Sequence, residues 1–167
     1  QDGRFRGGRP QPWTRGMTED RAFHRKAGEG YRWEGVELRP YKEDERALFR
    51  AITRQVLFCD PDGKAELRYF EVAPGGFSTL ERHEHVHAVM VLRGRGACLV
   101  GGEVREIGTH DLVSVPPMTW HQFRAAPGEP LGFLCMVDAE RDKPQLPTEE
   151  DLAQLCSDPD VPRFLKG

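Results

Sequence analysis

The sequence has 167 residues, a length that suits one domain with a sizeable hydrophobic core. Its 24 Lys and Arg residues and 27 Asp and Glu residues give a net charge of −3, without the basic surplus that nucleic-acid binding needs. No apolar run approaches the roughly 18 residues of a membrane span, and no apolar signal segment opens the chain. We therefore expect a cytoplasmic protein that binds neither nucleic acids nor membranes.

The composition favours a β-rich fold with free thiols. The chain contains 18 glycines and 13 prolines, which suit short strands and tight turns better than long helices. Its four cysteines include no Cys-x-x-Cys pair, so a structural zinc knuckle is not indicated. In a reducing cytosol we expect these cysteines to remain unpaired.

The composition and the apolar periodicity of the sequence change near residue 31. Residues 1–30 are rich in glycine and arginine with little apolar periodicity, so we predict a flexible extension there. Residues 31–41 alternate partly and predict one or two strands, whereas residues 47–59 fit either a short helix or a strand. Pro61 and Gly63 indicate a turn, and Pro74 with the two following glycines indicates another.

Short strands then recur at steady spacing, separated by glycine- and proline-rich turns. The predicted strands are 65–73, 85–93, 95–100, 103–107, 112–115, 120–125 and 131–137. This pattern is typical of a sandwich or barrel, so we predict an all-β domain over residues 31–138.

Residues 139–167 are predicted to form a C-terminal linker and one short helix. Thr148 is a suitable N-cap, and three acidic residues follow it, where the helix dipole favours them. Leu152 and Leu155 give the helix an apolar stripe that we expect to pack on the barrel.

The segment "LERHEHVHAVMV" carries the chemistry. Residues two apart in a regular strand point the same way, so Glu81, His83, His85 and His87 would share one side. Each buried polar group without a partner costs about 1–3 kcal/mol. A divalent metal would satisfy several of these groups together, and His121 would join them if its predicted strand lies alongside. The alternative is a set of hydrogen-bonded core histidines without a metal.

This segment resembles the first motif of the cupins, G-x5-H-x-H-x3,4-E-x6-G. The spacing matches at Gly75, Glu81, His83, His87 and Gly94. The residue types are exchanged at two positions, because Glu81 replaces the usual first histidine and His87 replaces the usual glutamate.

The second cupin motif, G-x5-P-x-G-x2-H-x3-N, is similar to "HDLVSVPPMTWHQFRA". Pro116 and His121 match, whereas His110 and Met118 replace the two glycines and Ala125 replaces the asparagine. The resemblance covers about residues 65–138. It implies a jelly-roll barrel, the cupin double-stranded β-helix, with extra N-terminal strands.

The resemblance also implies a ligand set. It assigns Glu81, His83, His87 and His121 to a divalent metal and leaves His85 as a neighbouring pocket residue. A replacement of Glu81 by His85 as the fourth ligand remains open. Manganese is the metal that the resemblance favours, with iron, nickel and zinc as alternatives.

Within the cupins, the chain looks like the methylthioxylulose-phosphate methylsulfurylases of methylthioadenosine salvage. That likeness implies removal of the methylthio group from 1-methylthioxylulose 5-phosphate, which gives 1-deoxyxylulose 5-phosphate. The acceptor thiol would be Cys135 or glutathione, and the enzyme would be a homodimer acting on a sugar phosphate. Arg68, Arg93 and Arg124 are candidates for holding an anionic substrate.

Two other functions remain open from the sequence. An iron-dependent dioxygenase could use the same ligands and would consume oxygen. A non-enzymatic cupin that binds a small ligand is the third reading.

Overall fold

The computed structural model describes residues 24–41, 50–60 and 62–167. The chain divides into two compact units, Gln1–Gly35 and Val36–Gly167. In the first unit, strands β1 (Ala27–Gly28) and β2 (Arg32–Trp33) form an antiparallel pair. Most of the extension predicted over residues 1–30 lies outside the described residues.

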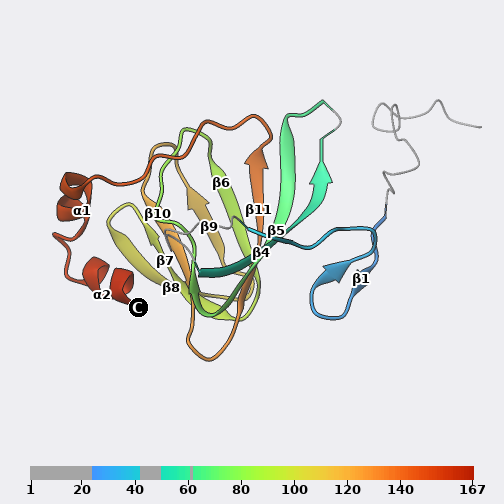
Figure 1. Cartoon of the computed structure of the whole chain (residues 1–167), viewed down its shortest axis with the longest axis horizontal. Helices are drawn as coiled ribbons and strands as arrows, with labels where there is room; N and C mark the ends of the chain where they lie inside the picture. Colours follow the sequence, from blue (N-terminus) through green and yellow to red (C-terminus); the bar gives the residue numbers. More distant parts are fainter. Residues whose placement is uncertain (1–23, 42–49, 61) are drawn as a thin grey trace, which may run out of the picture. The chain divides into compact units, whose positions relative to one another are not determined.

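The second unit is built on one curled antiparallel sheet (Figure 1). Its strand order is β8-β7-β10-β5-β11-β6-β9, with β4 paired to β5 and β3 paired to β4. The strands are β3 (Arg39–Pro40), β4 (Arg50–Cys59), β5 (Ala65–Phe77), β6 (His87–Arg93), β7 (Arg95–Val100), β8 (Glu103–Gly108), β9 (Leu112–Val115), β10 (His121–Ala125) and β11 (Leu131–Asp138). The prediction of an all-β barrel is confirmed.

The long strand β5 links the two halves of the curl. It pairs with β4 along much of its length and with β11 over its first part, and its last residue, Phe77, also pairs with Arg124 of β10. The turn predicted at residues 74–76 is wrong, because these residues continue the strand. Gly75 bends the strand there with a φ of +69°, a conformation that glycine adopts without steric cost, and its N–H donates to the carbonyl of Ala126.

The predicted later strands agree with the structure to within two residues. The ambiguous segment at residues 47–59 is strand β4 from Arg50 onward, paired along much of β5. The strand predicted from residue 85 instead begins at His87, and a loop precedes it.

The interior of the curled sheet holds an apolar core. Because side chains alternate along a strand, one face of each strand supplies this core. Its buried members are Ile52, Phe70, Val72, Val89, Val91, Cys98, Ile107, Val115, Phe123, Ala125, Leu131, Phe133, Cys135 and Val137.

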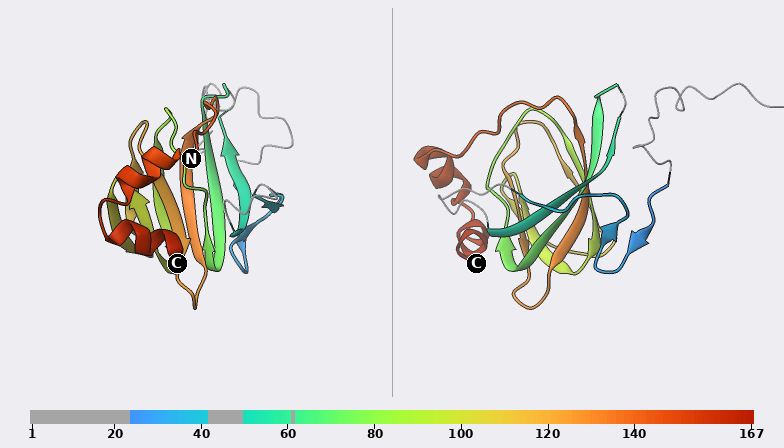
Figure 2. Two further views of the ribbon diagram at one scale, coloured as in Figure 1. Left: turned by 60° about the vertical axis from the view of Figure 1, so that its left-hand side comes forward. Right: turned by 45° about the vertical axis from the view of Figure 1, so that its right-hand side comes forward.

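Two short helices cover one outer side of the sheet (Figure 2). Helix α1 (Glu149–Leu155) has Thr148 as its N-cap, as the sequence predicts, and the Thr148 side chain accepts from the N–H of Asp151 in a capping box. Helix α2 (Asp160–Lys166) was not predicted. A second apolar cluster joins these helices to the sheet and contains Leu80, Leu99, Trp120, Leu155, Val161 and Phe164. Neither helix in the described part of the chain has the length and apolar character needed to cross a membrane.

Candidate metal centre

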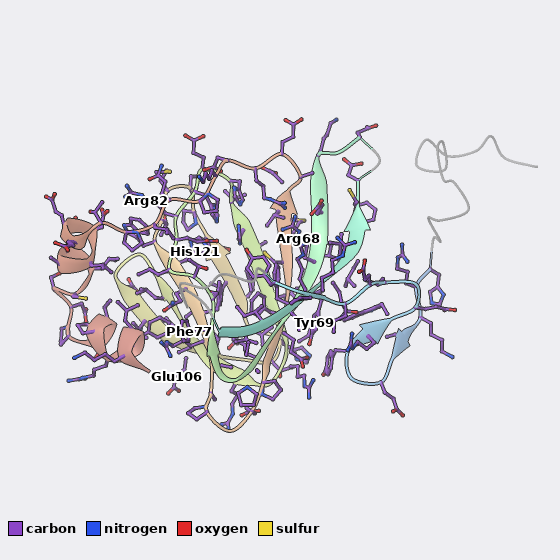
Figure 3. The ribbon with its side chains drawn as sticks, viewed as in Figure 1. Arg68, Tyr69, Phe77, Arg82, Glu106 and His121 are labelled. Atoms are coloured by element: carbon purple, nitrogen blue, oxygen red, sulfur yellow. The ribbon has the colours of Figure 1, made fainter. Side chains whose placement is uncertain are left out.

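The structure brings the two motif segments together at one end of the curled sheet. Glu81 and His121 exchange two backbone hydrogen bonds, with N···O distances of 3.2 and 3.0 Å. The carbonyl of His83 accepts from the N–H of Met118 at 2.7 Å. His121, labelled in Figure 3, therefore faces the loop that carries Glu81 and His83.

Two positions where the cupin motif has glycine keep a glycine-like backbone. His110 has a φ of +75° and Met118 a φ of +54°. This left-handed region is costly for residues with a Cβ atom. His110 and Met118 thus adopt a backbone conformation that favours glycine, at the expense of local strain.

All five predicted ligand residues contribute to one cluster, and His83 is at its centre. The ring of His83 lies 3.6 Å from that of His85, 4.5 Å from that of His87 and 4.8 Å from that of His121, centroid to centroid. Two overlapping groups have donor atoms within 4.8 Å of one another: His83, His85 and His87, and Glu81, His83 and His121. Either group could hold a metal ion.

Backbone carbonyls fix the orientation of two of the rings. Nδ1 of His83 donates to the carbonyl of His85 at 2.8 Å, and Nδ1 of His121 donates to that of Thr119 at 2.9 Å. Since a carbonyl oxygen only accepts, each Nδ1 carries the proton and each Nε2 keeps its lone pair. This is the arrangement that metal-binding histidines use.

The buried Nε2 atoms of His83 and His87 have no hydrogen-bond partner among the described residues. An unpaired buried nitrogen is costly, and two in one cluster indicate a site for a cation. Burial, with the neighbouring histidines, lowers the pKa of His87 to about 2, and burial lowers that of His121 to about 4. The rings are therefore neutral, which is the state that binds a metal. The donor set fits a divalent ion of the first transition row.

His85 has a different partner from the other rings. Its Nδ1 lies 2.7 Å from Oδ1 of Asp142, and Oδ2 of the same carboxylate accepts from the N–H of Glu84 at 2.8 Å. These bonds hold the pKa of Asp142 well below its usual range. Asp142 was missed from the sequence, because it lies in the segment interpreted only as a linker.

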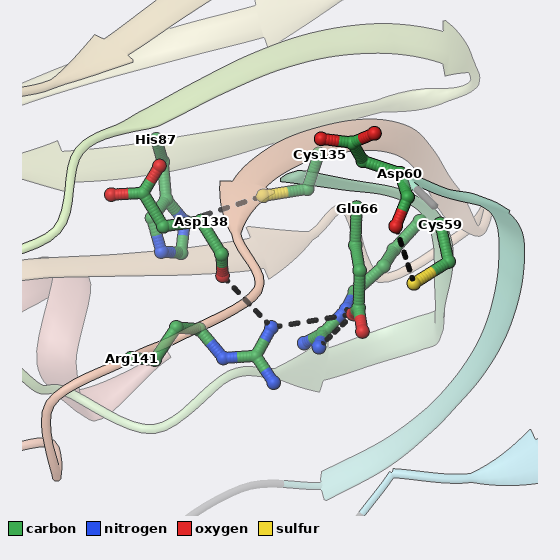
Figure 4. Close-up of polar contacts among 8 residues, drawn as sticks. Cys59, Asp60, Glu66, His87, Cys135, Asp138 and Arg141 are labelled. Carbon is green, nitrogen blue, oxygen red and sulfur yellow. Dashed lines mark hydrogen bonds and ion pairs between the residues drawn. The ribbon is translucent and has the colours of Figure 1, made fainter. Parts of the chain in front are cut away.

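Cys135 contacts the cluster through His87. Its Sγ lies 3.3 Å from Nδ1 of His87, as Figure 4 shows, and its side chain is buried. Burial raises the pKa of the Cys135 thiol to about 12. Cys98 is also buried, whereas Cys59 is exposed.

Two cavities meet at His87 and Cys135. The first, of about 50 Å³, is lined by Glu81, His87 and His121 together with core aromatic residues. The second, of about 300 Å³, is lined by His85, His87 and Cys135 and by three arginines, Arg54, Arg68 and Arg141. Of the arginines proposed from the sequence, only Arg68 lines this cavity; Arg93 pairs with Glu71, and Arg124 packs over Phe77.

Comparison with known proteins places these features in a family. Residues 68–137 match the Cupin domain model. The chain is 58% identical over 150 residues to the 1-methylthio-D-xylulose 5-phosphate methylsulfurylase of Rhodospirillum rubrum, an alignment that covers 90% of this chain and 96% of that protein.

Solved structures agree with this result. A cupin 2 conserved barrel domain protein from Rhodopseudomonas palustris is 55% identical with a TM-score of 0.80, over 84% of this chain and 97% of that one. A cupin-2 domain protein from Rhodospirillum rubrum is 58% identical with a TM-score of 0.78, over 88% of this chain and 98% of that one. The chain therefore belongs to the cupin family.

Proposed function

We propose that this chain is a metal-dependent enzyme that removes the methylthio group from 1-methylthio-D-xylulose 5-phosphate, in methylthioadenosine salvage. The observation that carries this proposal is the 58% identity to a methylsulfurylase over 96% of that enzyme's length. The cluster around His83 supplies a site for the metal, and the adjoining cavity of about 300 Å³ is large enough for a small ligand.

We propose Glu81, His83, His87 and His121 as the metal ligands, with His85 outside the set. The unpaired Nε2 atoms of His83 and His87 support this choice. The hydrogen bond of His85 Nδ1 with Asp142 does not distinguish the two roles, since metal-binding histidines also donate their other ring N–H to a carboxylate. The exclusion of His85 rests on the spacing of the cupin motif. Manganese is our first choice, and iron, nickel and zinc suit the same donors.

A bound divalent ion would act as a Lewis acid on the ketone of the substrate. The residues that line the two cavities would hold the substrate, and a thiol would accept the methylthio group. The thiol sulfur bonds to the methylthio sulfur while the bond from C1 to sulfur breaks, and its electron pair stays on C1. The thiol proton ends on C1. The products are 1-deoxyxylulose 5-phosphate and a methyl disulfide, so carbon is reduced while two sulfurs are oxidised.

Cys135 and glutathione are the two candidate thiols. Cys135 lines both cavities and contacts His87, which supports a catalytic role for it. Its raised pKa of about 12 makes the thiolate scarce at neutral pH, which favours a thiol from solution. A methylthio adduct on Cys135, detected by mass spectrometry after one turnover without glutathione, would identify Cys135 as the acceptor. Full activity of Cys135→Ala with glutathione present would identify glutathione.

The function is tested with purified protein, 1-methylthio-D-xylulose 5-phosphate, manganese and glutathione under anaerobic conditions. We expect 1-deoxyxylulose 5-phosphate, detected by phosphorus NMR. His83→Ala should be inactive, whereas His110→Ala, which removes an exposed histidine, should be unaffected. A dioxygenase would be favoured instead if no product forms under anaerobic conditions and the enzyme consumes oxygen once oxygen is admitted.

We further propose a homodimer that pairs through the outer face of the sheet. Exposed apolar side chains gather there, and cross-strand partners such as Met90 and Leu112 share the face. Met136 and Phe58, both more than half exposed, lie opposite the same residue, Leu67, on β5. Such a band favours association of two copies.

Light scattering should give twice the mass of one chain for the wild type. Met136→Lys should reduce this to one chain, whereas Glu103→Lys, on the far edge strand β8, should not. A monomeric wild type would contradict the proposal.

A further inference from the structure

The cavity beside His85 and His87 is lined by three arginines from separate parts of the fold. Arg54 lies on β4, Arg68 on β5 (Figure 3), and Arg141 in the segment after β11. Arg68 is buried, so its guanidinium is held away from bulk water. Three guanidinium groups around one cavity repel one another, and such an arrangement needs anions to balance it.

The carboxylates of the protein balance these charges only in part. Glu66 accepts from Arg68 and also from Arg141, at 3.4 Å from Nη1 of the latter (Figure 4). Asp142 also lines the cavity, but its oxygens already accept from the backbone of Glu84 and from His85. Glu66 is therefore shared between two of the three guanidinium groups, and Asp142 is engaged with Glu84 and His85.

Arg54 is the least satisfied of the three. Its Nε is buried and has no hydrogen-bond partner within the described parts of the chain. Its guanidinium carbon lies 5.8 Å from the ring centroid of Tyr41. Burial lowers the pKa of Arg54, and the charges of Arg68 and Arg141 lower it further. Arg54 is half-buried, and its buried Nε, which has no acceptor among the described residues, fits an anion site.

The position of this cavity matches a substrate that reaches the metal cluster. His87 and Cys135 line both cavities, so an anion held by the arginines would lie beside the reacting groups. The first cavity, of about 50 Å³, is too small for a pentulose phosphate, whereas the second, of about 300 Å³, lies at the lower end of ligand-pocket sizes.

We propose that Arg54, Arg68 and Arg141 bind the phosphate group of the substrate, a phosphate monoester dianion. The identity of the ester rests on the proposed function, but the anion site does not. Guanidinium groups pair with phosphate oxygens through two parallel hydrogen bonds, and a dianion matches the surplus of positive charge better than a carboxylate. The arginines then fix one end of the sugar so that its ketone lies toward His87.

The test measures binding of 1-deoxy-D-xylulose 5-phosphate, its unphosphorylated sugar and inorganic phosphate to the metal-loaded full chain by calorimetry. The wild type should bind the ester at least about tenfold more tightly than the sugar, and Arg54→Met and Arg141→Met should each weaken ester binding about tenfold or more. Arg54→Lys should keep part of the affinity. Arg105→Met, which removes an exposed arginine on β8, should bind like the wild type.

Metal content and circular dichroism report folding of each variant, and Arg141, at 28% exposure, is the safer site if Arg54→Met does not fold. Wild-type affinity of folded Arg54→Met and Arg141→Met, or equal binding of ester and sugar, would overturn the phosphate site. Arginine-dependent binding of inorganic phosphate without any methylthio release would overturn the proposed function while leaving the phosphate site intact. Methylthio release with a KM that neither arginine variant changes would overturn the phosphate site while leaving the proposed function intact.

Discussion

The carboxylate of Asp142 and the ring of His85 are joined at 2.7 Å, although 57 positions separate them in the chain. The same carboxylate accepts from the backbone N–H groups of Glu84 and His85. The segment after the barrel is thus fastened to the loop that carries the candidate ligands. Because the pKa of Asp142 is depressed in the fold, its stabilising contribution is present at neutral pH and is lost as the pH falls through that depressed pKa.

Removal of this carboxylate should loosen the histidine loop. We expect Asp142→Ala to lower the thermal midpoint by a few degrees and to weaken manganese binding, because partners of the histidine cluster orient it. Asp142→Asn keeps one acceptor oxygen and should lose less. Glu140→Ala, an exposed change two residues away, is the matched control. Equal midpoints for Asp142→Ala and Glu140→Ala, measured by calorimetry, would show that the contact does not order the loop.

Substitution of single candidate ligands should separate them by metal content. We expect His83→Ala and Glu81→Ala to lose most of the bound metal, because each removes a side chain that coordinates the ion. His85→Ala should keep about one equivalent of metal, because all four proposed ligands remain. Plasma mass spectrometry of dialysed protein gives the content. Chelation should lower the thermal midpoint of the wild type and of His85→Ala, but not that of His83→Ala. Metal retained by Glu81→Ala and lost by His85→Ala would mean that His85 is the fourth ligand.

Local signals explain what the sequence predicted well. Strands β7 to β11 follow from alternation between glycine and proline turns, and the cap at Thr148 from its own residue pattern. The ambiguity of β4 could not be settled locally, because pairing with β5 decides it. Helix α2 is short and is held by packing of Val161 and Phe164, which a local pattern does not show.

The residues of the site likewise fall into those that the sequence predicted and those that it could not predict. Motif spacing predicted Glu81, His83, His87 and His121 as one ligand set, whereas the structure gives two groups of three that share His83. That ligand set stays a prediction. The assumption of a regular strand was wrong, since a loop precedes His87. Asp142 and Arg54 reach the site only through tertiary contacts from distant segments, so no spacing along the chain could reveal them.

The burial of the cysteines predicts their order of alkylation. Cys59 is exposed, so iodoacetamide should modify it quickly in the folded protein at neutral pH. Burial raises the pKa of Cys98 to about 11 and that of Cys135 to about 12, and thiols, unlike thiolates, react slowly. Both should react only after unfolding in urea, as peptide mass spectrometry would show. Rapid labelling of Cys135 in the native protein would mean that its thiolate is accessible, and would strengthen its case as the acceptor.

The strained turn at His110 offers a test of the backbone argument. His110 is exposed with a φ of +75°, so its side chain contributes strain without burial. His110→Gly should relieve that strain and raise the free energy of unfolding by about 1 kcal/mol. Thr109 precedes it, is also exposed and is not among the positive-φ residues, so Thr109→Gly should instead destabilise through the greater freedom of the unfolded chain. Urea unfolding of the two variants should therefore give opposite signs, and a loss of stability in both would mean that the His110 side chain makes a contribution larger than its strain.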